Sequence, residues 1–322
     1  MSIFGTMKNF QKVSIASLLV LTIGVFGISS VKKHQDSVAK PVDVSFFIPE
    51  IAASLQFAGE QLPTKDVDVI ERLDKELLVN TFWHSNTILL LKRANRYFPI
   101  IEPILKRNGI PDDFKYLCMI ESGLSNVVSP SNAAGFWQFL EATGKKYGLE
   151  INEEVDERYH LEKATQAACD YLNNSYQLFN NWTLAAAAYN MGESGVLRQL
   201  AAQGVGNYYD LHLNTETSRY IFRILAAKEI YSNQVKYGFD IQKENLYPSI
   251  ATKLIAIDSA INDLPQFALQ LGTNYKHLKL LNPWLRKSFL KNKNNKLYRI
   301  ALPENAILTE SQIIKTEGEA EN

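Results

Sequence analysis

The chain has 322 residues, of which 46% are hydrophobic and 21% are charged, a balance typical of folded globular proteins and not of disordered ones. The 34 lysine and arginine residues balance 34 acidic residues, so the bulk charge argues against a strongly basic nucleic-acid-binding protein. Two cysteines are too few for a disulfide scaffold or a four-cysteine zinc site. The length allows about two domains.

One long uncharged apolar run lies near the N-terminus, from Val13 to Val31, with Lys8 and Lys12 before it and two lysines after it. As a helix it would be roughly 28 Å long, close to the ~30 Å hydrocarbon core of a bilayer. Basic residues before an apolar run are typical of a secretory signal, but no clear cleavage site follows this one. We expect residues 1–33 to be a cleaved signal peptide or, as the length favours, a membrane anchor. Either would export the rest of the chain.

Residues 34–65 are predicted to form a tether with one docking segment around Val44–Ile48. From Asp66 to about residue 237 the apolar spacing is helical, and no convincing period-two alternation appears. Helices are predicted to begin near Asp66 and then to cover 87–107, 111–122, 138–147, 161–179, 183–189, 194–202 and 216–233. A loop rich in serine, asparagine, proline and glycine is predicted over 125–135.

The character of the chain changes after about residue 237. Two short β-type runs, 254–257 and 297–302, enclose two short helical patterns, 264–271 and 275–281. The fold class is therefore predicted to be mainly α, with a helical domain over 66–237, a small βααβ domain over 250–304, and a polar, disordered tail over 305–322.

Glu121 is the residue that points most directly to chemistry. It follows five apolar or amphipathic residues at the C-terminal end of a predicted buried helix and precedes the polar loop. The helix dipole is negative there, and burial also disfavours a carboxylate, so both effects keep the acid protonated near neutral pH. A protonated carboxylic acid is what a general acid needs to donate a proton to a glycosidic oxygen. Taken alone, Glu121 is equally an ordinary helix-end carboxylate.

Three further clusters have structural interpretations. The four alanines before Tyr189, Asn190 and Gly192 indicate a closely packed helix with a glycine at its end. The run 156–158, Asp-Glu-Arg, is interpreted as a solvated turn with a local ion pair. Thr215 or Glu216 is expected to cap the helix that begins there.

In this order, however, the clusters resemble a known family. The run 116–139 reads YLCMIESGLSNVVSPSNAAGFWQF and is followed by YGL at 147–149, DER at 156–158, AAYNMGE at 187–193 and ETSRY at 216–220. These motifs resemble those of the lytic murein transglycosylases, closest to the membrane-bound D-type of the goose-lysozyme-like superfamily. The resemblance covers about residues 90–235 and implies a lysozyme-like helical domain.

The resemblance also implies an activity. The family cleaves the β-1,4 bond between N-acetylmuramic acid and N-acetylglucosamine without water and leaves a 1,6-anhydro ring. Glu121 matches the catalytic acid and base, and the matching substrate-binding positions are Ser129, Gln138, Tyr189, Asn190, Glu216 and Tyr220. Tyr189 and Asn190 are expected to line the cleft, with the Tyr189 hydroxyl in contact with the acid. The family serine is matched by Ser129 or, less well, by Ser131.

The βααβ segment weakly resembles a LysM-type glycan-binding module whose usual opening loop is replaced by 261–264, Ile-Asn-Asp-Leu. That loop forms part of the usual sugar groove, so the fold is expected and retained glycan binding is left open. Trp137 is expected to pack in the core and not to stack on a sugar. Cys118 and Cys169 are expected to be buried and unpaired.

No metal-ligand spacing, phosphate-binding glycine loop or dinucleotide-binding motif is present, so no metal or other cofactor and no nucleotide are expected. The predicted partners are peptidoglycan glycan strands and, through the N-terminal segment, a membrane, but no nucleic acid. The expected location is the periplasm of a Gram-negative bacterium. Two alternatives stay open: a lysozyme-like hydrolase on the same fold, and a non-catalytic cell-wall-binding protein.

Overall fold

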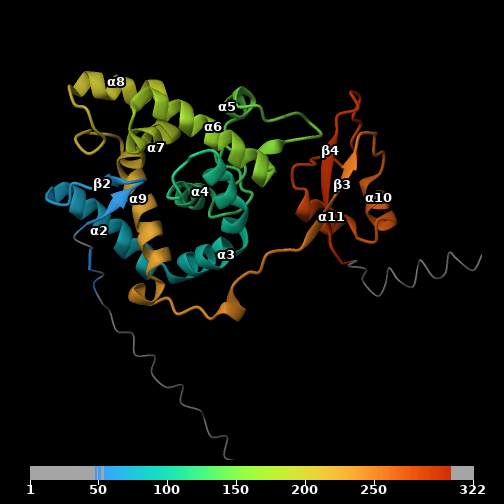
Figure 1. Cartoon of the computed structure of the whole chain (residues 1–322), viewed down its shortest axis with the longest axis horizontal. Coiled ribbons are helices and arrows are strands. Elements are labelled where there is room, and N and C mark those ends of the chain that lie inside the picture. Colours follow the sequence, from blue (N-terminus) through green and yellow to red (C-terminus); the bar gives the residue numbers. More distant parts are fainter. Residues whose placement is uncertain (1–47, 49, 52–53, 306–322) are drawn as a thin grey trace, which may run out of the picture. The chain divides into compact units, whose positions relative to one another are not determined.

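The computed structural model describes residues 48, 50–51 and 54–305, and the described chain forms a helical domain followed by a small domain with two strands (Figure 1). The mainly α fold class is confirmed. Three predicted segments fall wholly or mostly outside the described residues: the apolar run Val13–Val31, the docking segment around Val44–Ile48, and the tail over 305–322. Within the described part of the chain, no helix has the length and apolarity needed to cross a membrane.

The helices of the first domain follow the predicted order closely. Their bounds are α2 Val67–Phe82, α3 His84–Arg107, α4 Phe114–Ser122, α5 Glu141–Lys146, α6 Leu161–Phe179, α7 Trp182–Met191, α8 Glu193–Gln203 and α9 Thr215–Ser232. Short 3-10 turns cover Glu157–Tyr159, Gln234–Tyr237 and Lys243–Asn245.

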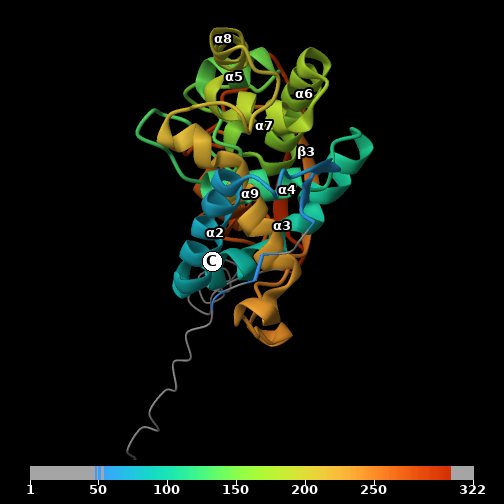
Figure 2. The same ribbon diagram turned by 90° about the vertical axis from the view of Figure 1, so that its left-hand side faces the viewer.

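Helices α2 and α9 lie side by side, as Figure 2 shows. The face of α2 that packs inward carries Val69, Leu73 and Leu77, which are spaced by four residues and are at most 1% exposed. Asp66 begins this helix, because its side chain accepts a hydrogen bond from the backbone of Asp68 (2.9 Å).

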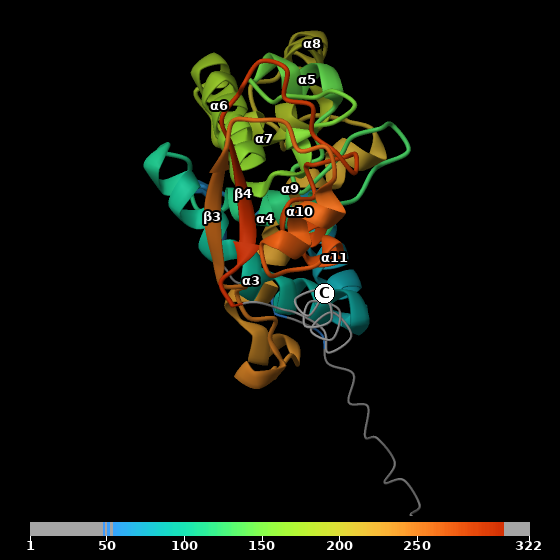
Figure 3. The same ribbon diagram turned by 90° about the vertical axis from the view of Figure 1, so that its right-hand side faces the viewer.

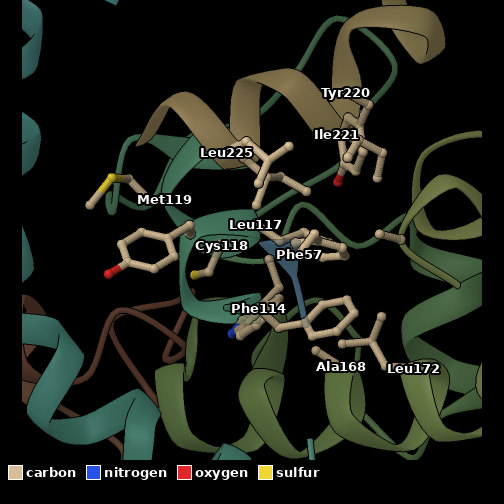
Figure 4. Close-up of a cluster of buried hydrophobic side chains, with 14 of the residues drawn as sticks. Phe57, Phe114, Leu117, Cys118, Met119, Ala168, Leu172, Tyr220, Ile221 and Leu225 are labelled. Atoms are coloured by element: carbon tan, nitrogen blue, oxygen red, sulfur yellow. The ribbon is translucent and has the colours of Figure 1, made fainter. Parts of the chain in front are cut away.

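Helix α4 lies at the centre of the domain and contacts α3 and α9. All of residues 114–119 are buried, and the one charged member, Lys115, is paired with Glu102 and Asp112. Figure 4 shows side chains of α4 meeting those of the N-terminal hairpin, α6 and α9 in one cluster. The residue that ends α4 is therefore held by a rigid core.

The end of the expected tether is part of this core. Strands β1 (Gln56–Phe57) and β2 (Glu60–Gln61) form a small antiparallel hairpin, and Phe57 is 0% exposed beside Phe114. Glu60 accepts hydrogen bonds from the backbone of Trp182 (2.5 Å) and Thr183 (2.9 Å), the first residues of α7. The prediction that the tether runs to residue 65 is thus wrong for residues 56–61. Burial of the apolar side chain of Phe57 stabilises the folded chain, so this segment packs on the domain.

The small domain has the predicted βααβ order. Strands β3 (Thr252–Ile257) and β4 (Tyr298–Pro303) are antiparallel, and α10 (Leu264–Gln270) and α11 (Tyr275–Leu281) lie on one side of them (Figure 3). Asp263 and Asn274 cap the two helices through their side chains.

The loop between α11 and β4 packs against residues 150–160 of the helical domain. The backbone N–H of Asp156 donates to the carbonyl of Trp284 (2.9 Å), and that of Arg286 donates to the carbonyl of Glu154 (2.7 Å). Val155 and Tyr159 share an apolar cluster with residues of the small domain. The small domain is therefore joined to the helical one by backbone bonds and apolar contact as well as by the chain itself.

Candidate active site

Glu121 lies in the last turn of α4, which ends at Gly123 in the left-handed conformation (φ 61°). Burial of the carboxyl group raises the pKa of Glu121 above its ordinary value. A hydrogen bond from Tyr220 and the positive charge of Arg223 partly oppose this rise in pKa, whereas Glu216 adds to it. The net effect favours the protonated acid, as the sequence predicted.

Tyr220, on α9, is the direct partner of the acid. Its hydroxyl donates a hydrogen bond to Oε1 of Glu121, and its side chain is 1% exposed. Burial and then the charge of Glu121 raise the pKa of Tyr220 well above its ordinary value, so the phenol stays neutral and acts as a donor. The next turn of α9 adds Arg223, which donates to the backbone carbonyl of Ile120 (3.0 Å).

Tyr189 lies near Glu121, but its hydroxyl points elsewhere. It donates to the backbone carbonyl of Trp137 (2.8 Å), and its ring packs edge-on against Phe139 and Tyr171. The expectation that the Tyr189 hydroxyl contacts the acid is wrong in this structure, because Tyr220 reaches the carboxyl group from α9. The resemblance placed Tyr220 among the substrate-binding residues, but its direct hydrogen bond to Glu121, 99 residues away, was not predicted.

Asn190 joins α7 to α9. Its amide donates to Oε1 of Glu216 (3.2 Å), and its Oδ1 accepts from Oγ1 of Thr217 (2.8 Å). The structure therefore brings Asn190 and Glu216 together, as the motifs suggested. Neither Thr215 nor Glu216 caps α9, because the side chain of Asn214 accepts from the N–H of Thr217 (3.0 Å).

Gln138 occupies a left-handed backbone conformation (φ 50°) at the end of the polar loop, three residues before α5 begins. Its side-chain amide donates to the carbonyls of Gly135 (2.7 Å) and Val127 (3.0 Å). A pocket of about 300 Å³ is lined by Gln138, Tyr189 and Asn190 together with residues of α5, α6 and α7. Three of the expected substrate-binding residues thus share one pocket.

Ser129 holds the loop rather than lining that pocket. Its Oγ accepts from the N–H of Ala133 (3.0 Å), and its own N–H donates to the carbonyl of the same residue (2.8 Å). Ser131 is exposed. Trp137 is 0% exposed and its indole donates to Oγ1 of Thr165 (2.9 Å), which confirms its place in the core.

The run 156–158 fixes the loop from the other side. Arg158 forms an ion pair with Asp156 (2.7 Å) and donates to the carbonyls of Asn132 (3.0 Å) and Phe139 (3.2 Å). A Cβ on Gly135 would lie 1.9 Å from the Arg158 carbonyl oxygen, so only glycine fits there. The local ion pair was predicted, but the turn is not solvated: Asp156 is 6% exposed.

Cys118 and Cys169 are both free and buried, as expected. In the part of the chain that the structure describes, no group of three or more histidine, cysteine, aspartate or glutamate side chains is arranged to hold a metal ion.

Two family models match this chain. The model of the transglycosylase SLT domain matches residues 98–211, and that of the soluble lytic transglycosylase C-terminal LysM-like domain matches residues 253–306. The chain contains an SLT transglycosylase domain followed by a LysM-like domain. The SLT match includes Glu121, Gln138 and Asn190 but ends before α9, so the partner of the acid lies outside it.

Two curated proteins are similar to this chain. The chain is 28% identical over 244 residues to "Membrane-bound lytic murein transglycosylase D" of Escherichia coli K12, a match that covers 73% of this chain and 52% of that protein. It is 24% identical over 179 residues to "Putative tributyltin chloride resistance protein" of Alteromonas sp., covering 52% of this chain and 82% of that one. The chain thus spans about half the length of the E. coli relative.

A solved structure of an inactive mutant of the lytic transglycosylase Slt from Pseudomonas aeruginosa is also similar, at 18% identity and a TM-score of 0.34. The likeness covers 48% of this chain and 26% of that one.

Proposed function

We propose that this protein is a peptidoglycan lytic transglycosylase that cleaves the β-1,4 bond between N-acetylmuramic acid and N-acetylglucosamine and forms 1,6-anhydro-muramic ends. Glu121 serves as the single general acid and base. The SLT domain and the similarity to the E. coli enzyme support the substrate class. The observation that carries the chemistry is a shielded carboxyl group whose direct hydrogen-bond partner is a neutral phenol.

The proposed reaction uses one carboxyl group twice. Glu121 in its protonated form donates its proton to the glycosidic oxygen, which leaves as the C4 hydroxyl of N-acetylglucosamine. The resulting carboxylate then takes the proton of the muramic C6 hydroxyl, whose oxygen bonds to C1 and closes the anhydro ring. No water is consumed, and Glu121 ends protonated and ready for another cycle. Tyr220 donates to the carboxylate form and so stabilises it between the two steps.

Glu216 is the residue on which the hydrolase alternative depends. It is the carboxylate whose charge acts on Glu121, and a lysozyme-like hydrolase needs a second carboxylate near the acid. Its carboxyl group, however, accepts a hydrogen bond from Asn190, which suits a positioning role. Substitution Glu216→Gln separates the two roles. If Glu216 is the base of a hydrolase, the variant should lose its activity, whereas if Glu216 only positions other groups, the variant should keep a measurable rate.

Mass spectrometry of digested sacculi tests the proposal. Lytic cleavage releases muropeptides that are lighter by one water than those a hydrolase releases. The proposal expects anhydro products from the wild-type chain and none from Glu121→Gln. Reducing muramic ends as the main product would establish the hydrolase instead. Sacculi that are bound but not cut would establish the non-catalytic alternative.

We also propose that the protein acts in the periplasm and is held at the membrane by residues 1–33. The basic residues before Val13–Val31 and the name of the E. coli relative support this. Cell fractionation of the full chain beside a chain without residues 1–33 tests it. The anchor predicts that only the full chain is found with membranes, and equal distribution of the two would contradict it.

A further inference from the structure

A second pocket, of about 580 Å³, is lined in part by Ile120 and Gly123, the residues near Glu121 at the end of α4. Three elements supply its walls: the end of α2 with the start of α3, the end of α4, and the first turns of α9. Its lining residues are Glu76, Val79, Asn80, Trp83, Asn86, Leu90, Met119, Ile120, Gly123, Thr215, Glu216, Arg219 and Arg223. We call it the α2–α3 pocket. Most of its lining lies outside the matched SLT segment.

Several side chains in this pocket have no protein partner for the groups they present. The indole of Trp83 is in an exposed residue (58%) and makes no ring contact or hydrogen bond with another described residue. The amide of Asn86 makes no hydrogen bond among the described residues. Arg223 makes no ion pair within the described chain, and one of its N–H groups donates to the Ile120 carbonyl. An apolar face, an amide and a cation are thus available to a ligand.

The exposed indole is not needed to build the corner between the two helices. Trp83 ends α2 and begins α3, and its backbone N–H donates to Val79 (2.9 Å) while its carbonyl accepts from Thr87 (3.1 Å). The hydroxyl of Thr87 also donates to the carbonyl of Asn80 (2.5 Å). Backbone atoms and a buried threonine therefore hold the corner, and the large apolar side chain is left toward solvent.

One hydrogen bond links the linings of the two pockets. Glu216 lines the α2–α3 pocket and accepts a hydrogen bond from Asn190, which lines the pocket of Gln138. Ile120 and Gly123, which flank Glu121, line the α2–α3 pocket as well. A glycan strand bound at Glu121 is therefore within reach of the α2–α3 pocket as well as of the pocket that Gln138 lines.

We propose that the α2–α3 pocket is a saccharide subsite in which the indole of Trp83 stacks on an N-acetylhexosamine ring of the glycan strand. Asn86 donates to or accepts from the polar edge of that sugar. A flat exposed aromatic face beside amides suits a pyranose ring, which has apolar C–H faces and a polar rim. The Glu76–Arg219 ion pair (2.5 Å) holds the pocket wall in place before the ligand arrives. The inference rests on the proposed function for the identity of the strand.

Binding to a chain that cannot cut tests this subsite. The full chain carrying Glu121→Gln is titrated calorimetrically with peptide-free glycan strands of two and of eight sugars. Adding Trp83→Ala is expected to weaken binding of the long strand about tenfold, and Trp83→Phe about two- to threefold, because part of the stacking face remains. A disaccharide that occupies the α2–α3 pocket should also bind more weakly to Trp83→Ala than to its parent. Phe82→Ala, next in sequence, exposed and outside the pocket lining, is the control and should bind as its parent.

The melting temperature of each variant is measured, and only variants that melt within a few degrees of the parent are compared. Equal binding of the long strand by the parent and Trp83→Ala would overturn the subsite. If Phe82→Ala weakens binding of the long strand as much as Trp83→Ala does, the subsite is overturned too. The loss would then come from a disturbed corner between α2 and α3 and not from the indole of Trp83. The assay needs no cleavage. A wild-type chain that releases no anhydro product, beside Trp83-dependent binding, would defeat the proposed function and leave the subsite standing.

Discussion

Two groups of shielded carboxylates in this chain have opposite partners. Glu121 receives its hydrogen bond from the neutral phenol of Tyr220, and its pKa is raised because burial outweighs every favourable interaction with the charged form. Glu150, at the junction with the small domain, is also partly buried, but hydrogen bonds from Lys296 and Tyr298 more than offset burial, so its pKa is lowered.

The comparison extends to other carboxylates away from the acid. Asp156 is paired with Arg158, Glu157 with Lys163 and Glu76 with Arg219. An ion pair thus holds each of these three carboxylates in place, whereas the carboxyl group of Glu121 accepts its hydrogen bond from a neutral phenol. The partner, and not burial alone, separates the catalytic candidate from the structural carboxylates.

The largest effect on the rate is expected when the carboxyl group of Glu121 is removed. Glu121→Gln should lower the rate of anhydro-muropeptide release by at least 10²- to 10⁴-fold, since general acid–base catalysis is typically worth about that much. The exposed Glu141→Gln is the control and should keep its rate. Residual activity of Glu121→Gln within about threefold of wild type would remove Glu121 from the mechanism.

The same variant should change stability with pH. A raised pKa means that the folded chain holds this proton more tightly than the unfolded chain does, so Glu121 contributes stability at low pH that is lost as pH rises through the folded-state pKa. The melting temperature of Glu121→Gln should therefore rise relative to wild type as pH increases from acid to neutral. A difference that is constant over this range would contradict the raised pKa.

Arg158→Met removes the cation from one of the ion-paired carboxylates. Asp156 would be left buried without its cation, and the carbonyls of Asn132 and Phe139 would lose a donor. We expect a loss of roughly 3 kcal/mol in the free energy of unfolding, measured by urea denaturation. Lys145→Met, in an exposed ion pair that water screens, should lower the free energy of unfolding much less than Arg158→Met does. Equal losses for the two variants would show that burial of the pair does not matter.

Tyr220→Phe removes the neutral hydrogen-bond donor of Glu121 and leaves the ion-paired carboxylates unchanged. Loss of one hydrogen bond to a charged group costs about 1.5–3 kcal/mol, or roughly 10- to 150-fold in rate. Because that bond lowers the pKa of Glu121, the alkaline limb of the pH–rate profile should move to higher pH. Tyr208→Phe is the matched control, since its buried hydroxyl donates to the Thr217 carbonyl (2.6 Å). An unmoved alkaline limb in Tyr220→Phe would contradict the assigned contact.

The smallest effect is expected at Tyr189. Its hydroxyl satisfies the Trp137 carbonyl, so Tyr189→Phe should cost about 1 kcal/mol in unfolding free energy and less rate than Tyr220→Phe. Initial rates and urea denaturation of both variants show which substitution lowers the rate more and which lowers stability more. A larger rate loss for Tyr189→Phe would restore the role that the motifs suggested for it.

Much of the helical framework was predictable because its signals are local. The apolar spacing of α6 marked Leu161–Phe179 to the residue, and the helix predicted over 87–107 ends at the same residue as α3. The hairpin at 56–61 was missed, since two-residue strands carry no alternation and Phe57 is buried only by contacts with distant residues. The corner at Trp83 was missed because α2 ends there with no glycine or proline.

The acid was also predictable, but its surroundings were not. The position of Glu121 after an apolar helix fixes its burial and the direction of its pKa shift. Which of two tyrosines donates to it depends on how α7 and α9 pack, and no spacing along the chain encodes that choice. The cation on Asp156 was local and was predicted, whereas its burial came from packing with the polar loop and the small domain.

The most direct test of the central claim is a titration of the carboxyl groups themselves. The chain is labelled with ¹³C at the glutamate side-chain carboxyl, and the resonance that is lost in Glu121→Gln is assigned to Glu121. The account predicts that this resonance titrates at higher pH than the resonance of Glu150, because the pKa of Glu121 is raised and that of Glu150 is lowered. A Glu121 resonance that titrates together with Glu150 would contradict the assignment of Glu121 as the proton donor.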